Sequence, residues 1–271
     1  MDSSPIRLNV DAARLARRVL FVSLVVEVLL FLLDYHVNFA EWTEIGAMRR
    51  LFNTAREDGL ASWFATTQTL LAGLTLVLIY LVTRGKRVSG KATGWLVLAG
   101  FFLYMAVDDG AQLHERLGST IDAMRENAGA SAAFFPSYTW QLVFLPVFGA
   151  LGLFMLVFLW RELESPWSRV LLLTAISFQA AAVGLDFVEG LEPDHPWNLY
   201  ATMADRFDLD AWTEERFGET AYDTLEHFSR SVEETLEMAA ISILWFLFLH
   251  HLGEAGPLEI RFSSGPPPAG A

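Results

Sequence analysis

The stretch Tyr104-Met-Ala-Val-Asp-Asp-Gly-Ala-Gln-Leu-His-Glu-Arg116 decides how the whole chain is interpreted. It begins as the end of an apolar run that is long enough to enter a bilayer. It closes on three carboxylates, an imidazole and a guanidinium within nine positions. Two later hydrophobic segments, Leu185–Gly190 and Glu226–Met238, carry similar polar groups. The function of the chain depends on whether these three segments meet in space.

Composition places the chain among membrane proteins. Its 271 residues are 53% hydrophobic, and its mean hydropathy of +0.35 is too high for an ordinary soluble domain. The apolar residues come in blocks rather than at the spacing of one helix face. The absence of cysteine excludes a disulfide framework, a thiolate metal site and a cysteine nucleophile. The net charge of -13 argues against a nucleic-acid partner.

Six segments reach the roughly 20 mostly apolar residues that a membrane-spanning helix needs. The sequence therefore predicts an all-α fold, a polytopic membrane helix bundle with six transmembrane helices. Basic residues precede the first span and fill the second and fourth connections, so the positive-inside rule predicts that both termini are cytoplasmic, in a cell inner or plasma membrane. The predicted spans are Leu15–Asp34, Leu60–Val82, Lys91–Ala111, Tyr138–Trp160, Val170–Glu189 and Glu233–Leu252.

The outer connections differ in character. Phe39–Gly59 mixes apolar and charged residues at near-helical spacing, which is typical of a helix lying in the membrane interface. Arg116–Ser137 is small and polar, with glycines and a proline that indicate turns. Residues 190–226 carry ten acids against two arginines together with several aromatic residues, which favours a folded acidic cap on a transmembrane domain of residues 1–252. Residues 253–271 are expected to form a flexible tail.

This topology brings the unusual polar groups of four spans to the same, outer end of the bundle. Helical spacing places Asp108, Gln112 and Glu115 on one stripe of a continuous helix. Only two guanidiniums, those of Arg116 and Arg230, lie near ten carboxylates. The candidate acids are Glu27, Asp34, Asp108, Asp109, Glu115, Asp186, Glu189, Glu233, Glu234 and Glu237.

Three explanations account for so many unneutralised acids near a membrane. The groups are open to water, several of them are protonated, or a bound cation supplies the missing charge. A cation also explains why two histidines accompany the acids, because imidazole and carboxylate are the usual ligands of zinc, iron or manganese, while carboxylates alone suit calcium. The expected ligands of a divalent metal ion, whose identity stays open, are Asp109, His114, Glu115, Asp186, His227 and Glu234.

Two short motifs carry a resemblance to known proteins. Trp63-Phe64 at the entry to the second span and Asp108-Asp109-x4-His114-Glu115 at the end of the third resemble a group of uncharacterised bacterial multi-pass membrane proteins. That resemblance implies a topology but no activity. A more distant analogy is to membrane hydrolases of the alkaline ceramidase type, which hold zinc with histidines and an aspartate in a seven-helix bundle. The chain departs from that pattern because six spans are predicted and no HxxxH pair lies in the last one.

The sequence leaves three functions open. The first is a metal-dependent hydrolase or oxidase that acts on a lipid or lipid-linked substrate, with Glu233 or Glu237 as general base. The second is a cation or proton transporter or channel, which the deep position of Glu27 favours. The third is a non-catalytic scaffold that binds a partner through the acidic outer segment.

Overall fold

All of the secondary structure in the described part of the chain is helical. A computed structural model describes residues 11–86, 89–129 and 135–255. In chain order the elements are α1 (Ala12–Asp34), the π-helix η1 (Tyr35–Phe39), α2 (Gly46–Phe52), α3 (Leu60–Gly85), α4 (Ser89–Ala111), α5 (Leu113–Asn127), α6 (Thr139–Glu162), α7 (Pro166–Glu189), α8 (Leu199–Phe207), α9 (Asp210–Phe217) and α10 (Ala221–Glu254).

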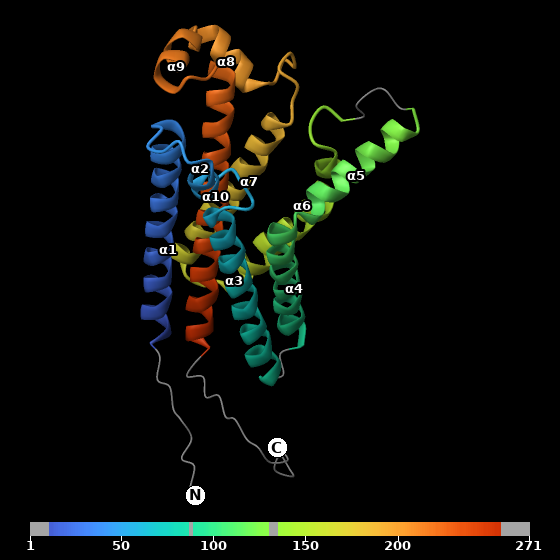
Figure 1. The fold of residues 1–271 in the computed structure, drawn as a ribbon. Coiled ribbons are helices and arrows are strands. Elements are labelled where there is room, and N and C mark those ends of the chain that lie inside the picture. The colour runs from blue at the N-terminus through green and yellow to red at the C-terminus, as the bar shows by residue number, and fades with distance from the viewer. Residues whose placement is uncertain (1–10, 87–88, 130–134, 256–271) are drawn as a thin grey trace, which may run out of the picture.

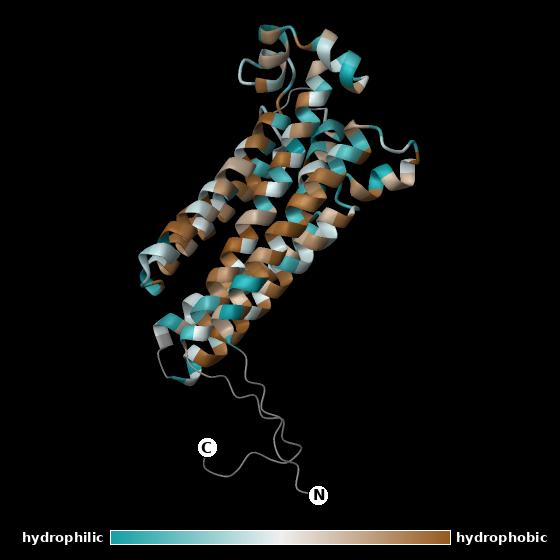
Figure 2. Cartoon of the chain, turned by 90° about the vertical axis from the view of Figure 1, so that its left-hand side faces the viewer, coloured by the Kyte–Doolittle hydropathy of each residue, from teal (hydrophilic) through white to brown (hydrophobic). Residues whose placement is uncertain are grey.

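Five of these helices, α3, α4, α6, α7 and α10, are long and apolar enough to cross a membrane. The prediction of a multi-pass, all-α membrane protein is therefore supported, whereas the count of six spans is not shown. Helix α1, the expected first span, is not among these five, and its sequence includes the charged residues Arg17, Arg18 and Glu27. Hydrophobic residues predominate along the middle of the long helices, and hydrophilic residues gather at their ends (Figure 2).

Helix α10 is the central element of the bundle, and it packs against α1, α3 and α7 (Figure 1). It has 34 residues, so it is about 51 Å long, while the hydrocarbon core of a bilayer is about 30 Å thick. Its first turns, which precede the predicted span Glu233–Leu252, therefore extend beyond the apolar layer. There they carry α8 and α9 (Figure 1).

The core is made where α3, α4, α7 and α10 meet. Trp95, Leu76, Leu172 and Phe248 are almost completely buried there. Helix α6 is different, because it has the highest mean hydropathy of the spans, 2.7, and yet only 11% of its apolar stretch is buried within the bundle. Such a helix presents most of its side chains to lipid.

The structure breaks the predicted stripe through Asp108, Gln112 and Glu115. Gln112 adopts a left-handed conformation with φ of +54°, so α4 ends at Ala111 and α5 begins at Leu113 in a new direction. The Asp108 carboxylate accepts a hydrogen bond of 3.0 Å from the backbone N–H of His114, an otherwise unpaired donor in the first turn of α5. The expected single stripe is wrong for this reason.

The connection expected to be a turn-rich loop is also mostly helical, because α5 continues to Asn127. It projects from the bundle beside α6 (Figure 1). Leu113, Leu117 and Met124 on its surface are 40%, 43% and 66% exposed. These residues recur at helical spacing, as in a helix that lies against a membrane surface.

The acidic segment 190–226 contains α8 and α9 rather than an unstructured tether. It is attached to the bundle by aromatic contacts. The ring of Phe39 in η1 stacks on Phe228 of α10 with centroids 4.0 Å apart, and Phe217 of α9 meets Phe39 edge-on at 5.5 Å. Most of the predicted tail, residues 256–271, lies outside the described residues, and α10 itself continues to Glu254.

Candidate functional site: an acidic cavity

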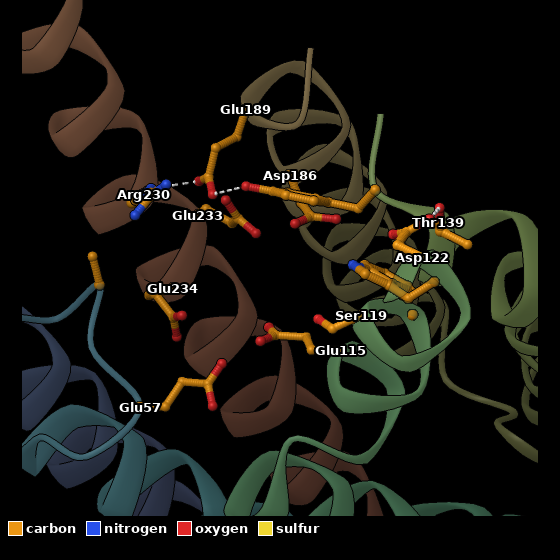
Figure 3. Close-up of a pocket in the computed structure, with 14 residues that line it drawn as sticks. Glu57, Glu115, Ser119, Asp122, Thr139, Asp186, Glu189, Arg230, Glu233 and Glu234 are labelled. Atoms are coloured by element: carbon orange, nitrogen blue, oxygen red, sulfur yellow. Dashed lines mark hydrogen bonds and ion pairs between the residues drawn. The ribbon is translucent and has the colours of Figure 1, made fainter. Parts of the chain in front are cut away.

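A cavity of about 320 Å³ lies among α5, α6, α7, α10 and the loop that precedes α3 (Figure 3). Seven acidic side chains line it against one basic side chain, that of Arg230. The lining residues are Ala55, Glu57, Glu115, Gly118, Ser119, Asp122, Tyr138, Thr139, Trp140, Asp186, Glu189, Arg230, Glu233 and Glu234.

Two close approaches of the backbone allow these walls to meet. A Cβ atom on Gly118 of α5 would lie 2.9 Å from the backbone nitrogen of Trp140. A Cβ atom on Gly190, which follows α7, would lie 2.9 Å from the backbone nitrogen of Tyr138. Only glycine fits at such distances, so these two residues bring α5 and α7 against the start of α6.

Bonded pairs neutralise one wall of the cavity. The Arg230 guanidinium forms an ion pair with Glu189, with Nε 2.8 Å from Oε2, and it donates a hydrogen bond of 2.8 Å to Glu226; the Tyr138 hydroxyl donates to Glu189 at 2.7 Å. Beside this group, the side-chain amide of Gln141 donates to Asp186 at 2.6 Å. Arg230 is therefore already shared between two carboxylates, and little of its charge is left for the opposite wall.

The opposite wall holds acids without such partners. The carboxyls of Glu57 and Glu115 lie within hydrogen-bond reach of each other, and both point into the cavity (Figure 3). Burial, followed by the adjacent Glu115 carboxyl, raises the pKa of Glu57 to about 8. Glu233 and Glu234 also face this space (Figure 3), and neither has a hydrogen bond or ion pair within the described residues. Close carboxyls of this kind favour any bound cation.

Local sequence explains why Glu57 is available. The neighbouring Asp58 forms ion pairs with Arg50 and Arg56, and these arginines lower the pKa of Asp58 to about 2. Arg50 and Arg56 are thus bonded to Asp58, while Glu57 turns toward the cavity. The sequence does not single out Glu57, because it is one of several charged residues spread through Phe39–Gly59.

His114 lies beside the cavity but does not line it. Its Nδ1 atom is 2.6 Å from the Oδ2 atom of Asp108, a completely buried residue, and its ring meets Trp140 edge-on at 4.4 Å. Although burial opposes the charged imidazole, the bonded Asp108 carboxylate, followed by Glu115 and Asp186, raises the pKa of His114. The second ring nitrogen, Nε2, is 4.0 Å from Oε1 of Glu115. Asp108 therefore orients this imidazole toward the edge of the acidic wall.

The second predicted histidine ligand belongs to another cluster. His227 Nε2 is 3.6 Å from Oδ2 of Asp34, a residue that is only 1% exposed. The same carboxylate accepts hydrogen bonds of 2.7 Å from Asn38, Thr54 and Ser231. His227 does not line the cavity, so the structure pairs the two histidines with two different aspartates.

Three further predicted residues also lie off the cavity wall. Glu237, one helical turn further along α10, accepts a hydrogen bond of 3.1 Å from Gln179. Asp109 accepts one of 3.3 Å from Thr69. Arg116 is exposed and donates to Gln112. Of the predicted site residues, those that meet at the cavity are Glu115, Asp186, Glu189, Arg230, Glu233 and Glu234.

Within residues 11–86, 89–129 and 135–255, no three His, Asp or Glu side chains are arranged to hold a metal ion. The metal ion stays a prediction. What the described residues do show is a cavity with a surplus of carboxylates, next to an imidazole whose orientation an aspartate fixes.

The helices and the cavity define a multi-pass membrane protein with a polar site at one end of its bundle. More particularly, the chain belongs to the family described as domain of unknown function DUF8692, which matches residues 19–252. No curated protein and no solved structure matches the chain. The comparisons thus show the family without a named relative, and they supply no support for the analogy with ceramidase-type hydrolases.

Proposed function

We propose that this protein binds a divalent metal ion in the acidic cavity. The observation that carries the proposal is the facing pair of Glu57 and Glu115, with Glu233 and Glu234 beside it and no free basic side chain on the cavity wall. Oxygen ligands with this charge suit a hard divalent cation such as calcium or manganese.

The orientation of His114 supports an imidazole ligand at the same ion. Histidines that bind metals commonly donate their other ring N–H to a carboxylate, which fixes the tautomer and the ring direction. The short contact between Nδ1 of His114 and Asp108 is of this type, and it leaves Nε2 on the side of Glu115. An imidazole ligand would favour manganese, iron or zinc over calcium.

We infer that the chemistry of the site is hydrolysis of a lipid or lipid-linked substrate. A metal ion bound there would supply activation of a water molecule. Glu233 is the better placed general base, because it faces the cavity without a bonded partner, whereas Glu237 is bonded to Gln179 outside it. A volume of about 320 Å³ suits a small headgroup. The apolar surface of α5, the helix that forms one cavity wall, supports access from the lipid surface.

Metal binding to the purified protein tests the proposal. Isothermal titration in detergent with Mn²⁺, and separately with Ca²⁺, should show one ion bound per chain. Glu57→Gln and Glu234→Gln should each weaken binding by roughly 10–100-fold, as the loss of groups at metal sites commonly does. Asp205→Asn is the matched control, because Asp205 is an exposed acid of α8 that does not line the cavity.

Two results would refute the proposal. One is a wild-type protein that binds neither ion and contains no metal after purification. The other is an equal loss of affinity in Asp205→Asn, because that would trace binding to the overall negative charge rather than to the cavity.

A further inference from the structure

A second polar cluster lies inside the helix bundle, apart from the acidic cavity. It joins Glu27 of α1, Gln68 of α3 and Ser242 of α10, which are 2%, 2% and 0% exposed. The Oε1 atom of Glu27 accepts hydrogen bonds from Ser242 Oγ at 2.6 Å and from Gln68 Nε2 at 3.0 Å. Gln68 Nε2 also donates to Ser242 Oγ at 2.7 Å. One carboxylate therefore links three helices.

The position of the cluster is deep in the apolar layer. Ser242 follows the cavity residue Glu234 by eight residues of α10, so at 1.5 Å per residue the cluster lies about 12 Å from the level of the cavity acids. Leu30, Ala61 and Met238 form a small buried apolar group one to two turns above it. Because Glu27 is almost completely buried, open water does not explain the acid.

No side chain of the described residues neutralises Glu27. It forms no ion pair with a lysine, arginine or histidine there, and its Oε2 atom is buried without a hydrogen-bond partner. The Oε1 atom of Gln68 is likewise buried and unpartnered. A charged carboxylate at the centre of a membrane helix costs on the order of 2.5–3.5 kcal/mol even on the lenient insertion scale. Some positive charge must therefore accompany Glu27.

We propose that Glu27 is a proton-binding site, and that its proton exchanges with solvent. A proton on Oε2 removes the charge and turns an unpartnered acceptor into a donor, while Oε1 keeps its two hydrogen bonds. A proton matches this site better than a metal ion does. A metal ion requires several oxygens around it, whereas the site has one carboxylate, and its three side chains are in direct contact at 2.6–3.0 Å. The site is independent of the cavity, and it adds a protonation step inside the bundle to the proposed metal binding.

Infrared difference spectroscopy of the full-length protein in lipid nanodiscs tests this proposal directly. The spectrum of wild type minus Glu27→Gln should contain the C=O stretch of a protonated carboxylic acid, and the band should shift down in D₂O. Ser242→Ala should keep the band but move it to higher wavenumber, since Oε1 then loses a hydrogen-bond donor. That shift identifies the band as belonging to this cluster, and the variant's elution on gel filtration confirms that it is folded.

Three outcomes would overturn the proposal. The first is the absence of a carboxylic acid band in the difference spectrum. The second is a band that stays unshifted after hours in D₂O, which would identify a sealed structural acid. The third is a band that disappears when Na⁺ replaces N-methylglucamine at constant ionic strength, which would identify a sodium site instead.

Discussion

Replacement of Glu57 by glutamine should remove part of the pH dependence of stability. In the native protein, burial and the adjacent Glu115 carboxyl raise the pKa of Glu57 from its ordinary value of 4.5 to about 8. Between these two values the folded state holds a proton that the unfolded state has released. Stability must therefore fall as the pH rises from about 4.5 through 8, as the linkage of proton binding to folding requires.

The size of this effect follows from the change in pKa. A carboxyl that moves from 4.5 to about 8 changes the free energy of unfolding by at most about 5 kcal/mol across that interval. Because Glu57 lines an open polar cavity, is only half-buried and shares its environment with Glu115, we expect about 1–2 kcal/mol. For a chain of this size, that corresponds to a fall of roughly 2–8 °C in the thermal midpoint.

The assay is thermal unfolding in detergent between pH 5 and pH 9, in the absence of divalent cations. The raised pKa of His114 also lowers stability as the pH rises, and it does so in both proteins. The difference between wild type and Glu57→Gln therefore reports Glu57 together with its interactions with Glu115, His114 and Arg116. Glu44→Gln, an exposed acid of the same loop, should behave as wild type.

A wild-type midpoint that rises over this range would contradict the raised pKa of Glu57, as would a Glu57→Gln variant that follows the wild-type curve at every pH. A further check uses the proposed ligand. A divalent ion at about 100 times its dissociation constant should restore roughly 2.7 kcal/mol at high pH in the wild type. It should restore much less in Glu57→Gln.

Three more predictions follow from the structure. Asp108→Asn should lower the free energy of unfolding by about 1–3 kcal/mol in a denaturant titration, because it disturbs a buried charge-assisted hydrogen bond, and an unchanged midpoint would contradict this. Gly118→Ala should cost about 1–3 kcal/mol in the same titration, since its Cβ would lie 2.9 Å from the backbone nitrogen of Trp140. Because the chain has no cysteine, Asp205→Cys and Lys86→Cys test its orientation in intact cells. If the positive-inside rule holds, an impermeant thiol reagent labels the first and spares the second, and the reverse pattern would invert the topology.

The helices and the convergence of acids could be predicted from the sequence because apolar runs fix both the position and the direction of spanning helices. Successive spans alternate in direction, so the third and fifth predicted spans end on the side where the sixth begins. Glu115, Asp186 and Glu234 were therefore expected at one end of the bundle. The structure places all three on one cavity. Length and hydropathy determine this level of organisation without any knowledge of side-chain contacts.

The details of the site could not be predicted in the same way. Nothing in the local pattern marks Gln112 as left-handed, yet that single residue redirects α5 and takes His114 out of line with the end of α4. The place of Glu57 depends on Asp58 bonding the nearby arginines. The separation of His227 from His114 depends on Asp34 being bonded within its own cluster. Each of these details depends on which of several chemically similar side chains meet in the tertiary structure.

Several acids near the cavity have bonded partners that offset their charge, and this distinguishes them from the acids of one cavity wall. Several buried acids have a specific partner: His114 for Asp108, His227 and three polar side chains for Asp34, and Arg230 for Glu189, whereas Glu27 has hydrogen bonds but no cationic partner among the described residues. Such pairing offsets the cost of removing a carboxylate from water. The acids of the opposite cavity wall lie only a turn or two from these paired groups, and they have no equivalent partner among the described residues. The unpartnered acids of this wall are therefore the observation on which the proposed cation site depends.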